Sequence, residues 1–230
     1  MLGIHNREWP NADVDRMSFP GGARVPSVGP QTAPASTTSG KVDCSQDGAG
    51  TDAIINPETT KPESLVKPLE PPGSHHLGAA QGWLGLGDWQ SALDELEFID
   101  PVMQSHPDVL AARCDIYTVA RKWPAVVALA EMLVELVPER PSGWVWRSSA
   151  LHGLMRTQQA FDLLLPAARK FPEIPMIPYD LACYCAQLGK LEEARRWLHQ
   201  SYEVGNGRML KGAARYDPDL APLFVNASEI

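Results

Sequence analysis

The side chains best suited to metal chemistry in this chain are cysteines, and their spacing argues against a metal site. Cys183 and Cys185 form a Cys-x-Cys pair inside an apolar helical pattern. On a helix, two residues at this spacing are about 200° apart and face opposite sides. No second Cys or His pair follows at zinc spacing. A cysteine in such a pattern is usually a small buried hydrophobic residue. We therefore expect neither a metal nor a cofactor.

The other candidates for catalysis are scattered along the chain. His75 and His76 are adjacent, so their side chains would not converge on a helix. The segment 82–87, GWLGLG, has glycines but neither the spacing of a phosphate-binding loop nor a preceding strand. The acidic residues are typical of a solvated helix face, namely Asp94, Glu95, Glu97 and Asp100. The sequence therefore predicts a protein that is not an enzyme.

Charge and hydropathy narrow the classes of partner. The formal net charge is −8, and no basic stripe offsets it, so a nucleic-acid partner is not expected. No apolar run approaches the roughly 18 residues that a membrane helix needs. The beginning of the chain, MLGIHNREWPNADVDR, has no apolar stretch typical of a secretory signal. We expect a cytoplasmic protein that does not enter a membrane.

Residues 1–72 differ in character from the rest of the chain. They hold ten of the 21 prolines and a segment rich in Gly, Ser, Thr and Ala, without apolar periodicity. Such a segment cannot bury enough apolar surface to offset its ordering entropy. We predict a disordered tail, either a tether or an extension without function.

From residue 73 onwards the pattern becomes helical and repeats every 34 residues, with frames that begin at Gly73, Pro107, Pro141 and Pro175. Position 20 of the frame is small, and positions 11, 17 and 24 are mostly large. Position 20 reads Ala92, Val126, Ala160 and Ala194. A small residue there lets the second helix of each frame approach the first. Glycine at position 15 of the outer frames ends the first helix in a left-handed conformation. The spacing predicts an all-α solenoid of four antiparallel helix pairs.

These positions resemble the tetratricopeptide-repeat (TPR) superfamily. The resemblance covers four repeats, 73–106, 107–140, 141–174 and 175–208, with a C-terminal cap over 209–230 that completes a domain over 73–230. Two departures stand out. Arg113–Cys114 and Arg147–Ser148 replace the usual Leu–Gly at positions 7 and 8, and Pro166 falls inside the second helix of the third repeat, where we expect a kink.

The end of the chain carries a second resemblance. The run Tyr-x-Leu-Ala-Cys-Tyr-x-Ala from Tyr179, followed by Asp-Pro-Asp-Leu from Asp217, is similar to the closing repeat of bacterial-type members of this superfamily. We expect Asp217 to cap a short helix that begins at Pro218. That helix would cover the open apolar face of the last pair, because a solenoid must hide its end.

The family resemblance implies that positions 2, 5, 9 and 12 of each first helix line a concave groove. We predict a partner-binding groove from these positions, together with Trp146 at position 6. Its residues are Leu77, Gln81, Leu84, Asp108, Asp115, Val145, Trp146, Ser149, His152, Met176 and Tyr179. Trp146 either leans into the groove or packs against the next repeat. An alternative interpretation buries three of the residues at these positions against neighbouring repeats, namely Leu77, Ala111 and Val145.

Two functions fit this pattern. The first is an adaptor or scaffold that binds a partner protein or peptide in the groove, with an extended, apolar and basic segment as the best fit. The second is an acidic chaperone of the TPR type that holds an unfolded client. The fourth repeat, the closing piece and the long tail argue against the second. Self-association through an uncapped first repeat is a third interpretation.

Overall fold

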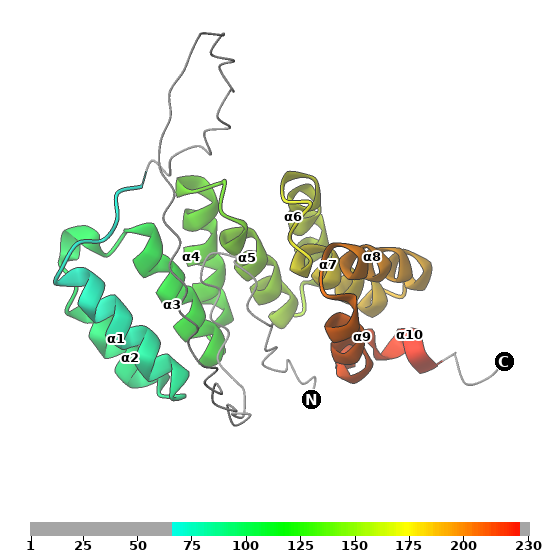
Figure 1. The fold of residues 1–230 in the computed structure, drawn as a ribbon, viewed down its shortest axis with the longest axis horizontal. Helices are drawn as coiled ribbons and strands as arrows, with labels where there is room; N and C mark the ends of the chain where they lie inside the picture. Colours follow the sequence, from blue (N-terminus) through cyan, green and yellow to red (C-terminus); the bar gives the residue numbers. More distant parts are fainter. Residues whose placement is uncertain (1–65, 226–230) are drawn as a thin grey trace, which may run out of the picture. The chain divides into compact units, whose positions relative to one another are not determined.

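The structure is a computed structural model that describes residues 66–225, and every regular element in this range is a helix (Figure 1). The predicted all-α class is therefore confirmed for the described residues. Within that range, no helix combines the length and apolar character needed to cross a membrane.

The helices come as four pairs followed by a closing segment. The first helices of the pairs, called A helices below, are α1 (Gly73–Gly85), α3 (Pro107–Val119), α5 (Pro141–Gly153) and α7 (Met176–Gln187). The second, or B, helices are α2 (Trp89–Glu97), α4 (Trp123–Leu136), α6 (Thr157–Lys170) and α8 (Leu191–Val204). A short 3-10 helix, η1 (Pro101–Met103), follows α2. The closing segment holds α9 (Gly207–Tyr216), η2 (Pro218–Leu220) and α10 (Ala221–Val225).

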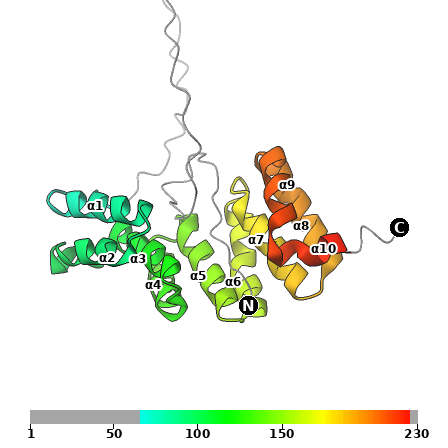
Figure 2. The same cartoon turned by 90° about the horizontal axis from the view of Figure 1, so that it is seen from below.

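The helix starts follow the period seen in the sequence. All four B helices begin 34 residues apart, and three of the A helices do so as well, while α7 begins one residue later. Each A helix packs against its own B helix, and each B helix packs against the A helix of the next pair (Figure 2). The A helices also contact one another in order, from α1 to α3, α5 and α7. Consecutive A helices thus form one row of the described unit.

The turn inside each pair is built the same way four times. The residue at position 15 has a positive φ in every pair, at Gly87, Arg121, Met155 and Gly189. The next N–H then bonds back to the carbonyl at position 11, as in Asp88 N to Trp83 O at 3.0 Å and Lys122 N to Tyr117 O at 2.8 Å. This bond satisfies a carbonyl that the helix end would otherwise leave unpaired. Two of the four turns therefore hold a non-glycine residue in a left-handed conformation.

Small buried residues mark the contacts within each pair. The four residues at position 20 are buried, and so are the four at position 24, Leu96, Ala130, Leu164 and Leu198. The buried apolar side chains gather into two clusters. One joins α1, α2 and α3, and the other runs from α5 to the closing segment. Helix α7 is buried almost throughout, because neighbours cover it on several sides.

The closing segment differs in detail from the expected cap. Asp217 does cap the turn that begins at Pro218, by accepting a hydrogen bond from Asp219 N. Leu220 and Leu223 are buried, with η2 on α7 and α10 against both α7 and α8. Helix α9, which the sequence analysis included in the cap over 209–230 without predicting a helix of its own, packs against α8 through Leu210 and Ala214.

Two further expectations concern the tail and Pro166. The predicted disorder of residues 1–72 falls mostly outside the described residues, which begin at residue 66. Within the described part, Leu69 is already buried in the first apolar cluster, so packing begins before Gly73. Pro166 lies inside α6, and the helix continues through it to Lys170.

The left-handed residues give the first testable prediction. Because a non-glycine residue in this conformation is strained by about 1–2 kcal/mol, we expect Arg121→Gly to raise the free energy of unfolding in urea. The gain should be smaller than the strain, since glycine also loses more entropy on folding. Arg121→Ala keeps the strain and serves as the matched control. Gly189→Ala should be destabilising. Equal stability of Arg121→Gly and Arg121→Ala would contradict this account of the turn.

The contact at position 20 gives the second prediction. Ala160 is fully buried between helices, so Ala160→Leu should overpack it and lower the free energy of unfolding by about 1–3 kcal/mol. The control is Ala128→Leu on the exposed side of α4, which should stay within about 0.5 kcal/mol of the parent. Thermal or urea melts followed by circular dichroism measure both. An unchanged midpoint for Ala160→Leu would mean that the register of the pair is wrong.

Candidate functional site

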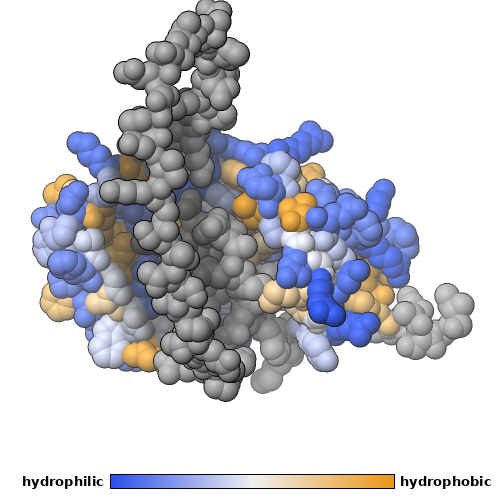
Figure 3. Space-filling view, in the orientation of Figure 1, coloured by the Kyte–Doolittle hydropathy of each residue, from blue (hydrophilic) through white to orange (hydrophobic). Residues whose placement is uncertain are grey.

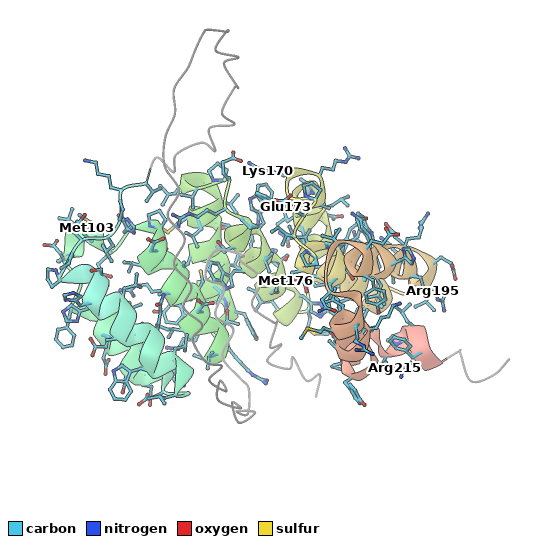
Figure 4. The ribbon with its side chains drawn as sticks, in the orientation of Figure 1. Met103, Lys170, Glu173, Met176, Arg195 and Arg215 are labelled. Atoms are coloured by element: carbon cyan, nitrogen blue, oxygen red, sulfur yellow. The ribbon has the colours of Figure 1, made fainter. Side chains whose placement is uncertain are left out.

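The predicted groove residues lie on the A helices, but they differ in exposure. Gln81 is exposed, and Asp108, Ser149, His152 and Met176 are partly exposed. Figure 4 labels Met176, which stands at the first residue of α7. The other predicted residues are buried, and these are Leu77, Leu84, Asp115, Val145, Trp146 and Tyr179. The accessible part of the predicted site is therefore mainly polar.

The two predicted aromatic anchors are buried in the structure. Trp146 is 3% exposed and Tyr179 is 1% exposed. The Tyr179 hydroxyl donates a hydrogen bond to Asp217 Oδ2 at 3.0 Å, which ties α7 to the closing segment. Of the two places considered for Trp146, burial among neighbouring helices is the one observed. A binding hot spot needs area that a partner can cover, so these two rings are not exposed anchors in this structure.

The two aspartates of the predicted groove, Asp108 and Asp115, both interact with other residues of the chain. Asp108 Oδ1 accepts a hydrogen bond from Arg140 Nη1 at 2.6 Å. Burial raises the pKa of the Asp115 carboxyl well above its usual range, and the nearby Trp146 indole offsets only part of this shift. Among the described residues, Trp146 Nε1 has no hydrogen-bond partner of ordinary geometry. The Asp108 carboxylate is therefore already paired with a cation, and the Asp115 carboxyl is buried.

A cluster of polar side chains links α5 to α7 beneath the closing segment. The Ser148 hydroxyl bonds to the Val145 carbonyl at 2.9 Å and to the Tyr184 hydroxyl at 3.3 Å. The His152 ring tilts against the Tyr184 ring at 5.1 Å between centroids. Its Nδ1 lies 2.9 Å from Thr157 Oγ1. His152 is thus held by a contact with the Tyr184 ring and by a polar contact at Nδ1.

The Asp-Pro-Asp-Leu segment attaches to this cluster. Asp217 accepts hydrogen bonds from Tyr179 and from the backbone of Asp219, so its carboxylate serves two helices. Gln187 Nε2 donates to the Asp219 carbonyl at 2.9 Å. Asp219 Oδ2 also lies 3.4 Å from His152 Nε2. Sequence reasoning picked out the motif only as an end piece and missed this network. The available signal was the pair of aspartates, Asp217 and Asp219, that follows a repeat carrying Tyr179.

A cleft of about 500 Å³ opens beside His152. It lies where the turn of the third pair meets the end of α7 and η2. Its lining consists of His152, Met155, Arg156, Thr157, Gln158, Gln159, Gln187, Leu188 and Asp219. Only His152 was predicted from the sequence, because the other residues come from turns and helix ends outside positions 2, 5, 9 and 12. Side-chain amides, a cation and an imidazole suit a polar segment held by hydrogen bonds.

The three cysteines of the described residues are buried. Cys114, Cys183 and Cys185 form no disulfide there, and all three are fully buried. Burial raises the pKa of Cys114, and Asp115 adds to this shift. Burial, with a further contribution from Glu193, raises the pKa of Cys185 to about 12. A thiol of this kind is neither a good nucleophile nor a good metal ligand at neutral pH. Among residues 66–225, no group of three or more His, Cys, Asp or Glu side chains could hold a metal ion.

Comparison with known proteins adds nothing to this picture: no protein-family model matches the chain, and no curated protein matches it. The geometry of the described residues therefore carries the functional argument by itself.

The buried Asp115 gives a prediction about pH. Because its pKa in the folded protein is raised above the ordinary value of 3.8, the folded state binds the proton more tightly than the unfolded state does. This contribution to stability is present at low pH and is lost as the pH rises towards the folded pKa. Asp115→Asn keeps the shape and cannot ionise. Its stability relative to the parent should therefore increase as the pH rises.

Urea midpoints of the parent and of Asp115→Asn, measured from about pH 4.5 to about pH 8, test this prediction. We expect the variant to gain on the parent across that range. A difference that stays constant, or that shrinks with rising pH, would mean that the Asp115 carboxyl is solvated in the folded protein.

Proposed function

We propose that this chain is a bacterial-type member of the tetratricopeptide-repeat superfamily. In this proposal it is a cytoplasmic adaptor or scaffold that binds an extended segment of a partner protein along the row of A helices. The observation that carries the proposal is the fourfold turn. At 34-residue intervals, a left-handed residue is followed by a backbone bond to position 11. Four turns of one design, between helices with small buried residues at position 20, are typical of a helical-repeat solenoid.

The row of A helices is the best candidate for the binding surface. Positions 2, 9 and 12 lie close together on one side of a helix, since seven residues make nearly two full turns. The partly exposed Asp108, Ser149, His152 and Met176 occupy these positions. In this proposal, the cleft beside His152 extends the surface towards the closing segment. A partner segment would follow the A helices and end in this cleft.

The chemistry of the accessible residues favours a segment that offers hydrogen-bonding groups. Ser149 and the amides of Gln159 and Gln187 could pair with the backbone of an extended peptide. Met176 and Met155 offer adaptable apolar contacts at the edges. Because Trp146 and Tyr179 are buried, we propose that the site recognises the backbone of the partner segment rather than its apolar or basic side chains. The proposal assigns no catalytic role and no cofactor.

The alternative of an acidic chaperone for an unfolded client is less well supported. Such a chaperone needs a broad apolar surface that stays open to many sequences. Here α7 is buried on almost all sides, and the closing segment packs over the fourth pair.

The test uses the full chain as bait to recover a partner, followed by affinity measurements on a matched pair of variants. Ser149→Arg places a large cation on the accessible side of α5, and Leu165→Arg places the same side chain on the exposed side of the B helix α6. We expect the first change to weaken binding at least tenfold, or about 1.4 kcal/mol, and the second to leave it unchanged. Circular dichroism must show both variants as helical as the parent. Loss of binding in Leu165→Arg alone would place the site on the B helices.

A further inference from the structure

The first helix pair has an open end on α1. Positions 6, 10 and 13 of the A helix face the preceding pair, as the third pair illustrates. Trp146 and Ala150 are buried, and a Cβ on Gly153 would lie 2.9 Å from the Trp123 ring. In α1 the same positions are Gly78, Gly82 and Gly85, and a Cβ on any of them would meet nothing within 4 Å. Within the described residues, no helix covers this side of α1.

The first pair and the 3-10 helix after it also carry exposed apolar side chains. Leu86 is 74% exposed, and Trp83, Phe98, Val102 and Met103 are exposed as well. Figure 4 labels Met103 near this end of the described helices. A terminal repeat that faces water normally presents a polar outer surface. The first pair departs from that rule, so its surface is suited to being covered.

The first pair is also strongly acidic. Residues 73–106 contain Asp88, Asp94, Glu95, Glu97 and Asp100, and they contain neither lysine nor arginine. One of the five, Glu95, is paired locally with His76 at 3.0 Å. Glu97 is paired with Arg113 from the next helix at 3.0 Å. The pair as a whole still carries a formal charge of −5 from its own residues, counted as five acids and no base.

The closing helix α9 has the complementary character. Arg208, Lys211 and Arg215 are spaced by three and four residues, so they share one side of the helix, and all three are exposed. No acidic residue lies between 205 and 216. Tyr216 is 87% exposed and Met209 is also exposed. Figure 4 places Arg215 on α9, and Figure 3 shows strongly hydrophilic side chains over this part of the molecule.

These two faces do not meet within one molecule. Helix α9 packs against α8 and the rest of the closing segment, whereas α1 packs against α2 and α3. The two ends lie apart in both Figure 1 and Figure 2. We infer that copies of this chain associate head to tail: the basic, apolar face of α9 in one copy docks on the acidic, apolar first pair of the next. The occupant is a second copy, because one chain carries both halves of the charge pairing.

A contact between two different faces does not close on itself in a dimer. It adds further copies in a row, unless the rotation between copies closes a ring. Association should therefore grow with concentration. It should also weaken with salt, because exposed charges about 10 Å apart are screened at moderate ionic strength. Partner binding on the A helices uses other residues, so the two activities can be separated by mutation.

The test is sedimentation velocity on the full chain up to about 200 µM, at salt concentrations of about 50 mM and about 500 mM. The first variant, Arg208→Glu with Lys211→Glu, reverses the charge of two basic side chains on α9. The second, Gln90→Lys with Asp94→Lys, makes two exposed positions on α2 of the first pair basic. Each variant alone should associate at least tenfold more weakly than the parent. An equimolar mixture of the two variants should associate again, because the acidic α9 of the first variant then meets the basic first pair of the second. The unchanged α9 of the second variant also meets the unchanged first pair of the first.

The control is Arg169→Glu with Arg196→Glu, which makes the same charge change at exposed positions on α6 and α8. It should associate like the parent, and melting curves should show all variants folded. Three results would overturn the inference. The first is a parent protein that stays monomeric at every protein and salt concentration. The second is a control variant that loses association as fully as the α9 variant does. The third is a mixture of the two variants that stays monomeric.

Discussion

The close approach of two helices at position 20 is the contact on which the rest of the structure depends. Ala92, Val126, Ala160 and Ala194 are all buried, and none is larger than valine. A small residue here lets the B helix lie directly on its A helix, and the buried leucines or alanine at position 24 then fill the space beside the contact. The next A helix can pack on that B helix only if this distance is the same in every pair. One recurrent packing constraint thus sets the order of the eight paired helices, α1 to α8.

The end of the described chain is held by a different kind of interaction. Asp217 binds both the Tyr179 hydroxyl and the backbone of its own turn, while Asp219 meets Gln187 and His152. Single hydrogen bonds contribute only about 1 kcal/mol each to stability. A buried network is costly when one member is removed, however, because the others lose partners. The network therefore orients the closing segment over α7 and also holds His152 beside the cleft.

Much of the helical framework followed from the sequence, because the period is strict and the small residues recur at one position. The B helices begin where the 34-residue spacing places them. Burial of Trp146 and Tyr179 did not follow, since position on a helix gives a direction but not the neighbours that fill it. Asp115 is a similar case: a carboxylate was expected in a groove, yet burial raises its pKa. Helix α9 was missed because its apolar side, Leu210 and Ala214, is short and the helix itself contains two glycines.

Native-state hydrogen exchange, read helix by helix by mass spectrometry, tests most directly whether stability comes from contacts between neighbouring pairs. In a stack with nearest-neighbour coupling, protection should fall from the interior towards an uncovered end. The account predicts the slowest exchange in α7 and α5. It predicts the fastest exchange among the paired helices in α1 and α2, because the first pair has a neighbouring pair on one side only. Equal protection in all eight helices, or faster exchange in α7 than in α1, would contradict it.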